Sequence, residues 1–331
     1  MEMEMETEME VLEEGRGELI QPPDVEGFRR WLRENKSMAL EDKLMTEREA
    51  VERFVHDGDY IGFELYGTVR CPMSLAREIV RQGKKRLRLA GQGLNELDLL
   101  IAAGLVEKLD LTYIGYEVHG LSNILRRAAE GGKLKIVEWS NAAMAWRFKA
   151  AAMGVPFIPV RSMLGTDTFK YSAAKAVRCP FTELKLTLLP ALILDVGIIH
   201  VHRADRYGNC QIDGISGFAL EMARASKRLI ISAEEIIDTE EIRRYPDRTV
   251  IPYFLVDAVV HAPFGSHPGD MAYMYDRDRE HLRKFLEASK TEEGTRAYLD
   301  EYVYGVKDHQ GYLRLIGEKR LEELRRLAKG R

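Results

Sequence analysis

The chain has 331 residues, 45% of them hydrophobic, and a formal net charge of −4 with acidic and basic residues interspersed, so it can bury a sizeable core and has no basic stripe for nucleic acid. Its three cysteines form no CxxC pair, which argues against a disulfide framework. It has no apolar run of the roughly 18 residues that span a membrane and no signal-peptide pattern, so we expect a cytoplasmic protein without a membrane partner.

Residues 1–44 are predicted to be an extension ahead of the main fold. The first ten residues alternate Met and Glu almost perfectly, and a like-charged, low-complexity stretch of this kind favours disorder. Residues 25–35 carry apolar side chains at helical spacing and predict a short helix. We therefore expect a partly disordered extension followed by one α/β domain over residues 45–331.

The domain begins with a helix capped by Thr46, with Glu49 as its capping-box partner. Strands and helices then alternate, with glycine-rich connections. We predict strands at 60–63, 87–90, 111–115, 134–137 and 157–160, and helices between them at 72–82, 95–103, 121–129 and 141–153. This rhythm predicts a parallel sheet covered by helices.

A polar, less regular segment over residues 162–190 separates this run from a second group of elements. We predict strands at 197–202, 228–232 and 256–261, followed by amphipathic helices at 278–288, 292–302, 309–316 and 318–329. The predicted fold class is therefore α/β, with an open, mainly parallel sheet, helices on both faces and C-terminal helices.

Ligands of open parallel sheets bind where strands end and the following helices begin. The residues at these positions are the candidate substrate contacts: Gly62, Phe63, Gly91, Gly93, Gly115, Ser140 and Asn141. Glycine lets a ligand approach the backbone, and a helix N-terminus offers free N–H groups to a thioester oxyanion, a carboxylate or a phosphate. The same glycines are also explained as turn-formers.

Two acids follow apolar strands, Glu64 and Glu117, and each is a candidate nucleophile or general base. The alternative is an acid exposed in a loop or bonded to a neighbouring helix end. His200 and His202 share one side of a predicted strand, but no carboxylate or cysteine completes a familiar ligand set. We therefore expect a hydrogen-bonding role for both histidines and no metal site.

Several blocks in fixed order carry a resemblance to a known family. They are His56-Asp57-Gly58-Asp59, Asp195 to His200, Tyr207-Gly208-Asn209, Val256 to Pro268, and Lys307-Asp308-His309. Over about residues 45–320 the chain resembles the A-type subunit of class I CoA transferases, most closely the glutaconate type. Ordered blocks over nearly the whole fold are more specific than one motif.

The resemblance implies transfer of CoA from an acyl-CoA to a carboxylic acid, with no cofactor apart from the CoA thioester that is the substrate. A glutamate attacks the thioester and holds CoA as a glutamyl thioester, in a ping-pong mechanism. In the glutaconate type this glutamate lies in a Ser-Glu-Asn-Gly-like motif of the B-type subunit, and this chain has no such motif. A B-type partner is therefore implied, in an αβ or α2β2 assembly, while this chain lines the acyl pocket and supplies oxyanion donors.

Two other functions stay open at this stage. Some relatives are hydrolases that open rings of CoA esters, with an acid near the segment that reads Glu138-Trp139-Ser140-Asn141 here, so Glu117 or Glu138 is a candidate base. Asn141 stands at the place of that acid. Non-catalytic, ligand-sensing proteins share the general fold, and fold alone does not fix function. The acyl group is not assigned, because Glu64 and Glu117 place negative charge where a dicarboxylate would bind.

Overall fold

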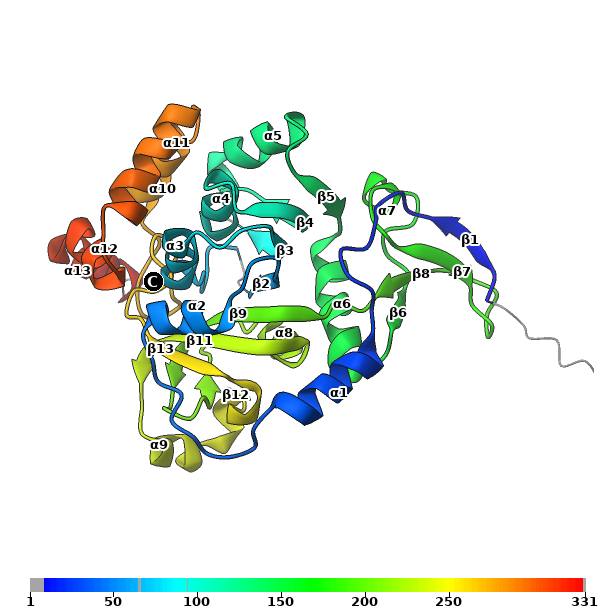
Figure 1. Ribbon diagram of the computed structural model, residues 1–331, viewed down its shortest axis with the longest axis horizontal. Helices are drawn as coiled ribbons and strands as arrows, with labels where there is room; N and C mark the ends of the chain where they lie inside the picture. The colour runs from blue at the N-terminus through cyan, green and yellow to red at the C-terminus, as the bar shows by residue number, and fades with distance from the viewer. Residues whose placement is uncertain (1–8, 65–66, 94, 330–331) are drawn as a thin grey trace, which may run out of the picture.

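The computed structural model describes residues 9–64, 67–93 and 95–329, and it is shown in Figure 1. Among these residues no helix is both long and apolar enough to cross a membrane. Of the Met/Glu repeat in the first ten residues, which is predicted to be disordered, residues 1–8 lie outside the described part of the chain.

Within the residues that the structure describes, the main sheet has seven parallel strands, in the order β13-β11-β9-β2-β3-β4-β5. Their bounds are β2 Tyr60–Glu64, β3 Leu87–Gly93, β4 Val106–Ile114, β5 Lys135–Glu138, β9 Leu194–Ala204, β11 Ser226–Ile236 and β13 Ala258–His261. The antiparallel strands β10 (Cys210–Gln211) and β12 (Thr249–Ile251) extend it beside the end of β9. The predicted open, mainly parallel sheet is confirmed.

The order of the strands reverses between β2 and β9. From β2 the chain adds β3, β4 and β5 on one side, and it later adds β9, β11 and β13 on the other. Such a reversal is the point where open α/β sheets bind ligands, outside the carboxyl ends of the strands. The topology therefore directs attention to the residues that follow β2 and β9.

Helices cover both faces of the sheet (Figure 1). One face packs against α2 (Glu47–Phe54), α3 (Met73–Gln82), α4 (Asn95–Ala102) and α5 (Asn123–Glu130). The other packs against α1 (Val25–Asn35), α6 (Asn141–Met153) and α8 (Ala219–Arg224). Shorter elements are α7 (Asp167–Lys170) and α9 (Thr239–Arg244), with single 3₁₀ turns at Glu117–His119, Pro246–Arg248 and Tyr253–Leu255.

The C-terminal helices form an outer layer on the face of α3 and α4. They are α10 (Arg279–Ala288), α11 (Glu292–Leu299), which continues into a short π-helix at Asp300–Tyr304, α12 (His309–Ile316) and α13 (Glu318–Lys329). The bounds predicted for α12 and α13 match the structure.

The alternation of side chains along the strands builds two cores. Ile61 and Phe63 of β2 join the core under α2 to α5, while Tyr60 joins the core under α1, α6 and α8. This follows from the period of two along an extended chain. The intervening Gly62 leaves room for the second core, because a Cβ there would lie 2.3 Å from Leu194 Cδ1 and 2.8 Å from Met222 Cε.

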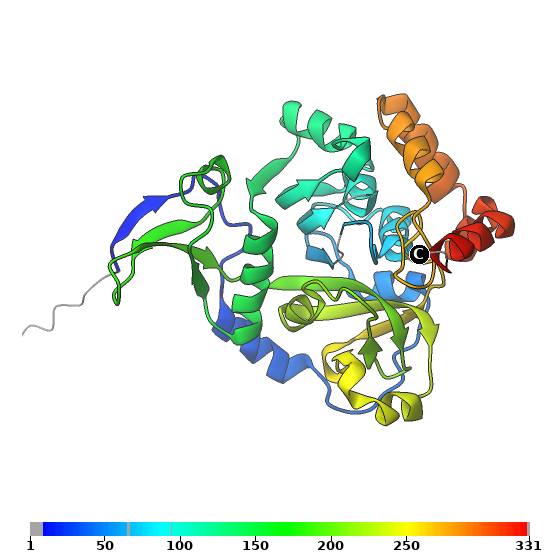
Figure 2. The ribbon, with the colours of Figure 1, turned by 180° about the vertical axis from the view of Figure 1, so that it is seen from behind.

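A second, smaller sheet is antiparallel, in the order β1-β7-β8-β6. Its strands are β1 (Val11–Glu14), β7 (Lys175–Arg178), β8 (Lys185–Pro190) and β6 (Phe157–Val160). It lies at the opposite end of the molecule from the C-terminal helices, with α6 between the two sheets (Figures 1 and 2).

The prediction that residues 157–160 continue the parallel sheet is wrong, because this strand pairs antiparallel with β8. The polar segment 162–190, predicted to be irregular, folds into the β7–β8 pair that gives it a partner. Residues 11–14 of the predicted extension add an edge strand to the same sheet. The local sequence pattern thus predicted the strand at residues 157–160 correctly, but its pairing with the distant β8 places it in the second sheet.

The helix start predicted at Thr46 is confirmed. The N–H of Glu49 donates to Thr46 Oγ1 at 3.2 Å, and the N–H of Thr46 donates to Glu49 Oε2 at 2.9 Å. Both halves of the capping box are therefore present.

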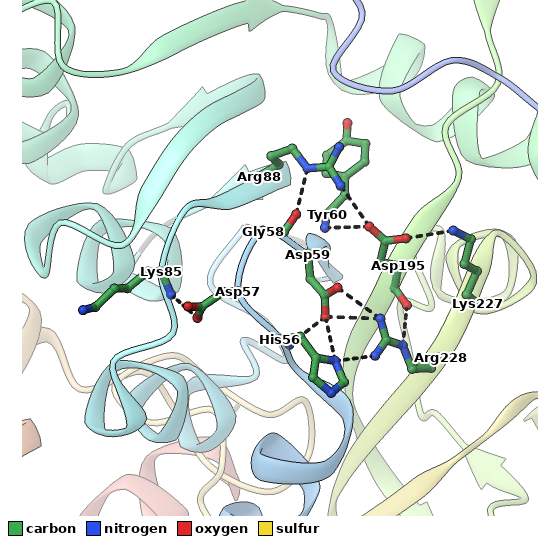
Figure 3. A network of polar contacts seen from close by, with 10 residues as sticks. All are labelled: His56, Asp57, Gly58, Asp59, Tyr60, Lys85, Arg88, Asp195, Lys227 and Arg228. Atoms are coloured by element: carbon green, nitrogen blue, oxygen red, sulfur yellow. Dashed lines mark hydrogen bonds and ion pairs between the residues drawn. The ribbon is translucent and has the colours of Figure 1, made fainter.

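The Asp57-Gly58-Asp59 motif lies at the amino ends of the strands (Figure 3). Asp59 accepts hydrogen bonds from the backbone N–H of His56 at 2.8 Å and from Arg228 at 3.1 Å. Nearby, Asp195 accepts from Arg88 at 3.0 Å and from Lys227 at 2.9 Å. These contacts join β2, β3, β9 and β11 at the edge away from the ligand-binding ends, so the motif has a structural role.

Candidate functional site

Glu64 ends β2 at the reversal of the strand order and forms a buried ion pair. Arg70 Nη1 donates to Glu64 Oε2 at 2.7 Å and Nη2 to Oε1 at 3.1 Å, and neither side chain is exposed to solvent. Arg70 also donates to the backbone oxygens of His200 at 3.2 Å and Ile215 at 3.1 Å. The pair thus joins β2 and β9 to the loop at residues 213–217, with the carboxylate already neutralised by a cation.

Gly217 shows how closely that loop approaches the ion pair. Its φ is +54°, and a Cβ there would lie 2.4 Å from Glu64 Oε1. A side chain at this position would have to displace the buried carboxylate of Glu64. The loop can therefore pack against the ion pair only with a glycine at position 217.

His200 and Glu234 form a second buried network beside the first. His200 Nδ1 lies 2.8 Å from Ser232 Oγ, and its Nε2 lies 2.8 Å from Glu234 Oε1. Glu234 also accepts from the N–H groups of Phe264 at 2.7 Å and Gly265 at 3.1 Å, and from the hydroxyl of Tyr275. The carboxylate of Glu234 therefore fixes the segment after β13.

His202 also has a hydrogen-bonding role, as predicted for both histidines. The N–H of Asp213 donates to its Nδ1 at 3.1 Å, so its Nε2 is the donor to Ala272 O at 2.9 Å. Burial lowers the pKa of His202, which favours the neutral ring.

The glycines at the ends of β3 and β4 sit where the backbone meets neighbouring side chains. A Cβ at Gly91 would lie 3.2 Å from Phe63 O, one at Gly93 2.3 Å from Leu97 Cδ1, and one at Gly115 2.2 Å from the Tyr113 hydroxyl oxygen. Each of these three glycines therefore leaves room for a neighbouring group of the fold.

Asp98 of α4 fixes the loop that follows β4. It accepts hydrogen bonds from the Ser122 hydroxyl at 2.6 Å and from the Tyr116 hydroxyl. Burial raises the pKa of Asp98 to about 6, although both hydroxyl donors lower it. The loop also carries Glu117, whose backbone begins a 3₁₀ turn and whose side chain lies outside what the structure describes.

A groove of about 1050 Å³ opens at the carboxyl ends of β4 and β5, against α5 and α10. Its apolar lining includes Leu111, Ile114, Leu121, Leu125, Ile136 and Leu286, and its charged lining includes Arg126, Glu138, Arg283, Glu287 and Lys290. A groove with an apolar floor and a few charged groups suits an organic acyl group with a polar end.

Glu138 lines this groove, whereas Ser140 and Asn141, which follow it in the chain, begin helix α6. Glu138 is the last residue of β5 and lines the groove. The Ser140 hydroxyl accepts from the N–H of Ala143 at 3.1 Å as the N-cap of α6, and Asn141 is the exposed first residue of that helix. The candidates therefore separate into one groove acid, one capping residue and one surface amide.

The junction between β5 and α6 is held by a buried aspartate. Asp110 accepts from Trp139 Nε1 at 2.9 Å and from Arg147 Nη1 at 2.8 Å, and the Arg147 guanidinium lies 3.9 Å from the centre of the Trp139 ring. This cluster fixes the direction in which Glu138 leaves the sheet.

Sequence reasoning missed Arg70, Asp98, Asp110 and Glu234, which hold the loops of this edge. Each has partners far along the chain, such as His200 for Arg70 and Tyr275 for Glu234. A buried charge inside an otherwise apolar strand was the available signal for Asp110 and Glu234, because such charges are rarely buried unless paired.

Comparison with known proteins adds a family match. A family model described as coenzyme A transferase matches residues 44–262. The A-type subunit of the 3-oxoadipate CoA-transferase from Pseudomonas knackmussii is 38% identical over 281 residues, which cover 83% of this chain and 99% of the relative. The cholesterol ring-cleaving hydrolase IpdA subunit of Rhodococcus jostii is 28% identical over 279 residues, covering 81% of this chain and 94% of the relative.

The fold is also close to that of a solved enzyme. The A-type subunit of the glutaconate CoA-transferase from Acidaminococcus fermentans is 35% identical over 304 residues, which cover 86% of this chain and 94% of the relative. The crystal structure of that glutaconate CoA-transferase superposes with a TM-score of 0.83, covering 85% of this chain and 95% of the solved chain at 34% identity.

Proposed function

The chain belongs to the coenzyme A transferase family as an A-type subunit, and on that basis we propose that it transfers CoA together with a B-type chain that supplies the nucleophilic glutamate. The resemblance drawn from residues 45–320 is confirmed at the level of the family. The assembly, αβ or α2β2, and the division of labour between the chains belong to the proposal.

One observation supports a nucleophile from outside this chain. The buried carboxylates described at the carboxyl edge already have partners: Glu64 binds Arg70, Asp98 binds Tyr116 and Ser122, and Glu234 binds His200 and backbone N–H groups. A carboxylate held in this way is a poor nucleophile, because attack requires it to leave its donors. These acids support the loops and leave the attack to a partner.

The proposed reaction begins when a carboxylate oxygen of the partner's glutamate attacks the acyl carbonyl carbon of the donor. The carbon–sulfur bond breaks, CoA leaves as a thiolate, and an acyl-glutamyl anhydride remains. The thiolate then attacks the glutamyl carbonyl, which releases the donor acid as a carboxylate and leaves CoA on the glutamate. The acceptor carboxylate repeats the two steps in reverse order, so the glutamate is regenerated and no net proton is taken up.

We place the acyl group in the groove at the ends of β4 and β5. Its apolar lining fits a carbon chain or ring, and Arg126, Arg283 and Lys290 offer positive charge to a polar end.

The test is co-expression with a B-type chain, followed by an exchange assay with acetyl-CoA as donor and short mono- and dicarboxylic acids as acceptors. We expect exchange, and after donor treatment we expect borohydride to reduce one glutamate of the B chain. Replacement of that glutamate by Gln should abolish exchange. Exchange that survives the replacement, or a trapped residue in the present chain, would contradict the proposal.

A CoA-ester hydrolase is a second candidate, because Glu138 lines the groove and its carboxylate has no hydrogen-bond or ion-pair partner within residues 9–64, 67–93 and 95–329. The hydrolase subunit that is 28% identical to this chain makes this function worth a direct test. On this proposal Glu138 activates water, so Glu138→Gln should abolish hydrolysis of a ring-bearing CoA ester. Glu287→Gln, on α10 in the same groove, is the control. If Glu138→Gln keeps full CoA exchange and the wild type hydrolyses no ester, the hydrolase proposal fails.

A further inference from the structure

Asn95 is a buried side chain with an unused donor. It is 3% exposed, and its Nδ2 has no hydrogen-bond partner anywhere in the part of the chain that the structure describes. A buried amide normally finds an acceptor, because an unsatisfied donor costs the desolvation of that group. The Asn95 Nδ2 donor is therefore available to an acceptor that another molecule supplies.

The position of Asn95 points to a ligand. It is the first residue of α4, which follows β3, and β3 is the neighbour of β2 at the reversal of the strand order. Side chains of a helix lean toward its N-terminus, so the amide projects toward the carboxyl ends of the strands. The free N–H groups of the first turn lie at the same end and favour a negatively charged or strongly polar oxygen.

Asp98 of the same helix does not bind this donor. Asp98, three residues further along, accepts from the hydroxyls of Tyr116 and Ser122 instead. These two hydroxyls offset the negative charge of Asp98 and link α4 to the loop after β4. A donor that is already in place needs no reorganisation when a charge develops beside it.

We propose that Asn95 Nδ2 donates a hydrogen bond to the carbonyl oxygen of the acyl thioester as the partner's glutamate adds to it. This inference rests on the proposed function and names the donor for the reacting oxygen. When the glutamate oxygen bonds to the acyl carbon, the electron pair of the C=O π bond moves to that oxygen. The pair returns as the carbon–sulfur bond breaks and CoA leaves as a thiolate, so the hydrogen bond is strongest between the two events.

The discriminating variant is Asn95→Ala in the complex with the B-type chain. We expect kcat for CoA exchange to fall about 100-fold with little change in KM, as for the loss of one oxyanion donor. We expect the melting temperature to stay level or rise, because the change removes a buried donor that has no partner in the folded chain. A merely structural amide would give the opposite result, a lower melting temperature with turnover nearly kept.

Asn95→Asp provides a second variant of the same size without an amide donor, and it should lose exchange to a similar extent. Thr249→Val is the matched control, because Thr249 Oγ1, on the edge strand β12, is another buried polar atom without a hydrogen-bond partner among the described residues. This control should keep kcat. Exchange within twofold of the wild type in Asn95→Ala, or an equal loss in Thr249→Val, would overturn the proposal.

The wild-type complex distinguishes a failure of the proposed transferase function from a failure of the role proposed for Asn95. If the wild-type complex exchanges no CoA but hydrolyses acetyl-CoA, the transferase proposal fails, and hydrolysis then becomes the readout for Asn95→Ala with the same expected loss. A wild-type complex with neither activity overturns both proposals.

Discussion

Single buried charges determine what the candidate acids of this protein can do. Glu64 looked like a possible nucleophile from its place after an apolar strand, yet it is paired in full with Arg70, six residues later. Arg70 itself has a φ of +61°, an uncommon conformation for a residue with a side chain, and it is held there by three different segments. The pair is therefore a structural support under the site.

Arg70→Met should destabilise the protein strongly. It keeps much of the volume but leaves the Glu64 carboxylate buried without a counter-charge, which typically costs about 3–5 kcal/mol in the free energy of unfolding. Urea unfolding followed by circular dichroism measures the loss. Lys175→Met breaks an exposed pair with Glu14, so it serves as the control and should change nothing measurable. A loss below about 1 kcal/mol for Arg70→Met would show that the buried pair is dispensable.

At the scale of elements, a cluster of buried rings fastens the C-terminal helices to α3. The Arg77 guanidinium lies 3.6 Å from the centre of the Tyr312 ring on α12 and donates to His267 O at 3.1 Å. On α10, His281 Nε2 lies 2.7 Å from the Tyr298 hydroxyl of α11. Burial lowers the pKa values of His267 and His309, and lowers that of His281 to about 3, so the cluster is built from neutral imidazoles.

Acid should therefore loosen this layer. In the unfolded chain a histidine takes up a proton near pH 6.5, whereas the folded His281 resists it until about pH 3. The unfolded state binds more protons across that window, so the stabilising contribution is full above pH 6.5 and is lost as the pH falls toward about 3.

Urea unfolding at pH 7.5, 6.5 and 5.5 measures the slope of the free energy of unfolding against pH. His281→Phe should flatten it by up to about 1.4 kcal/mol per pH unit, the value for one proton. The exposed His261 provides the control through His261→Gln, which should leave the slope unchanged. An unchanged slope in His281→Phe would mean that this histidine is not kept neutral by the fold.

At the scale of the whole molecule, we propose that the B-type chain docks at the carboxyl edge of the sheet, because this edge exposes apolar side chains. Val118 is 92% exposed and Leu121 69%, both in the loop after β4, and Tyr273 is 76% exposed near the loop fixed by Arg70. Exposed apolar side chains grouped at a functional edge are typical of protein interfaces. On the proposed function, the partner's glutamate approaches the acyl group from this edge, and Leu121 also lines the groove.

Leu121→Lys should weaken binding of the B-type chain at least tenfold, because it places a charge in an interface that buries an apolar side chain. The melting temperature of the isolated chain should not change, since Leu121 is exposed. Calorimetric titration measures the affinity, and Leu327→Lys on α13, at a leucine that is 47% exposed, is the control. Equal affinities for both variants would place the partner on another surface.

Residues close together in the chain are enough to set the repeating features of this protein. The period-two burial of β2, the capping box at Thr46 and the bounds of α12 and α13 all follow from such neighbours. The ordered blocks from 45 to 320 identified the family, because each block is also local. Hydrophobic periodicity and helix caps are properties of neighbouring residues, so they can be recognised before the fold is known.

Which polar groups meet depends instead on the packing of distant segments. Residues 157–160 look like a strand from sequence, but their antiparallel partner β8 placed them in the second sheet. The sequence did not predict the ion pair between Glu64 and Arg70. Nor did it predict that the Asn95 amide is buried without an acceptor among the described residues. The partner of a buried charge is known only once the tertiary structure is formed, and the low dielectric around it makes that pairing decisive for its chemistry.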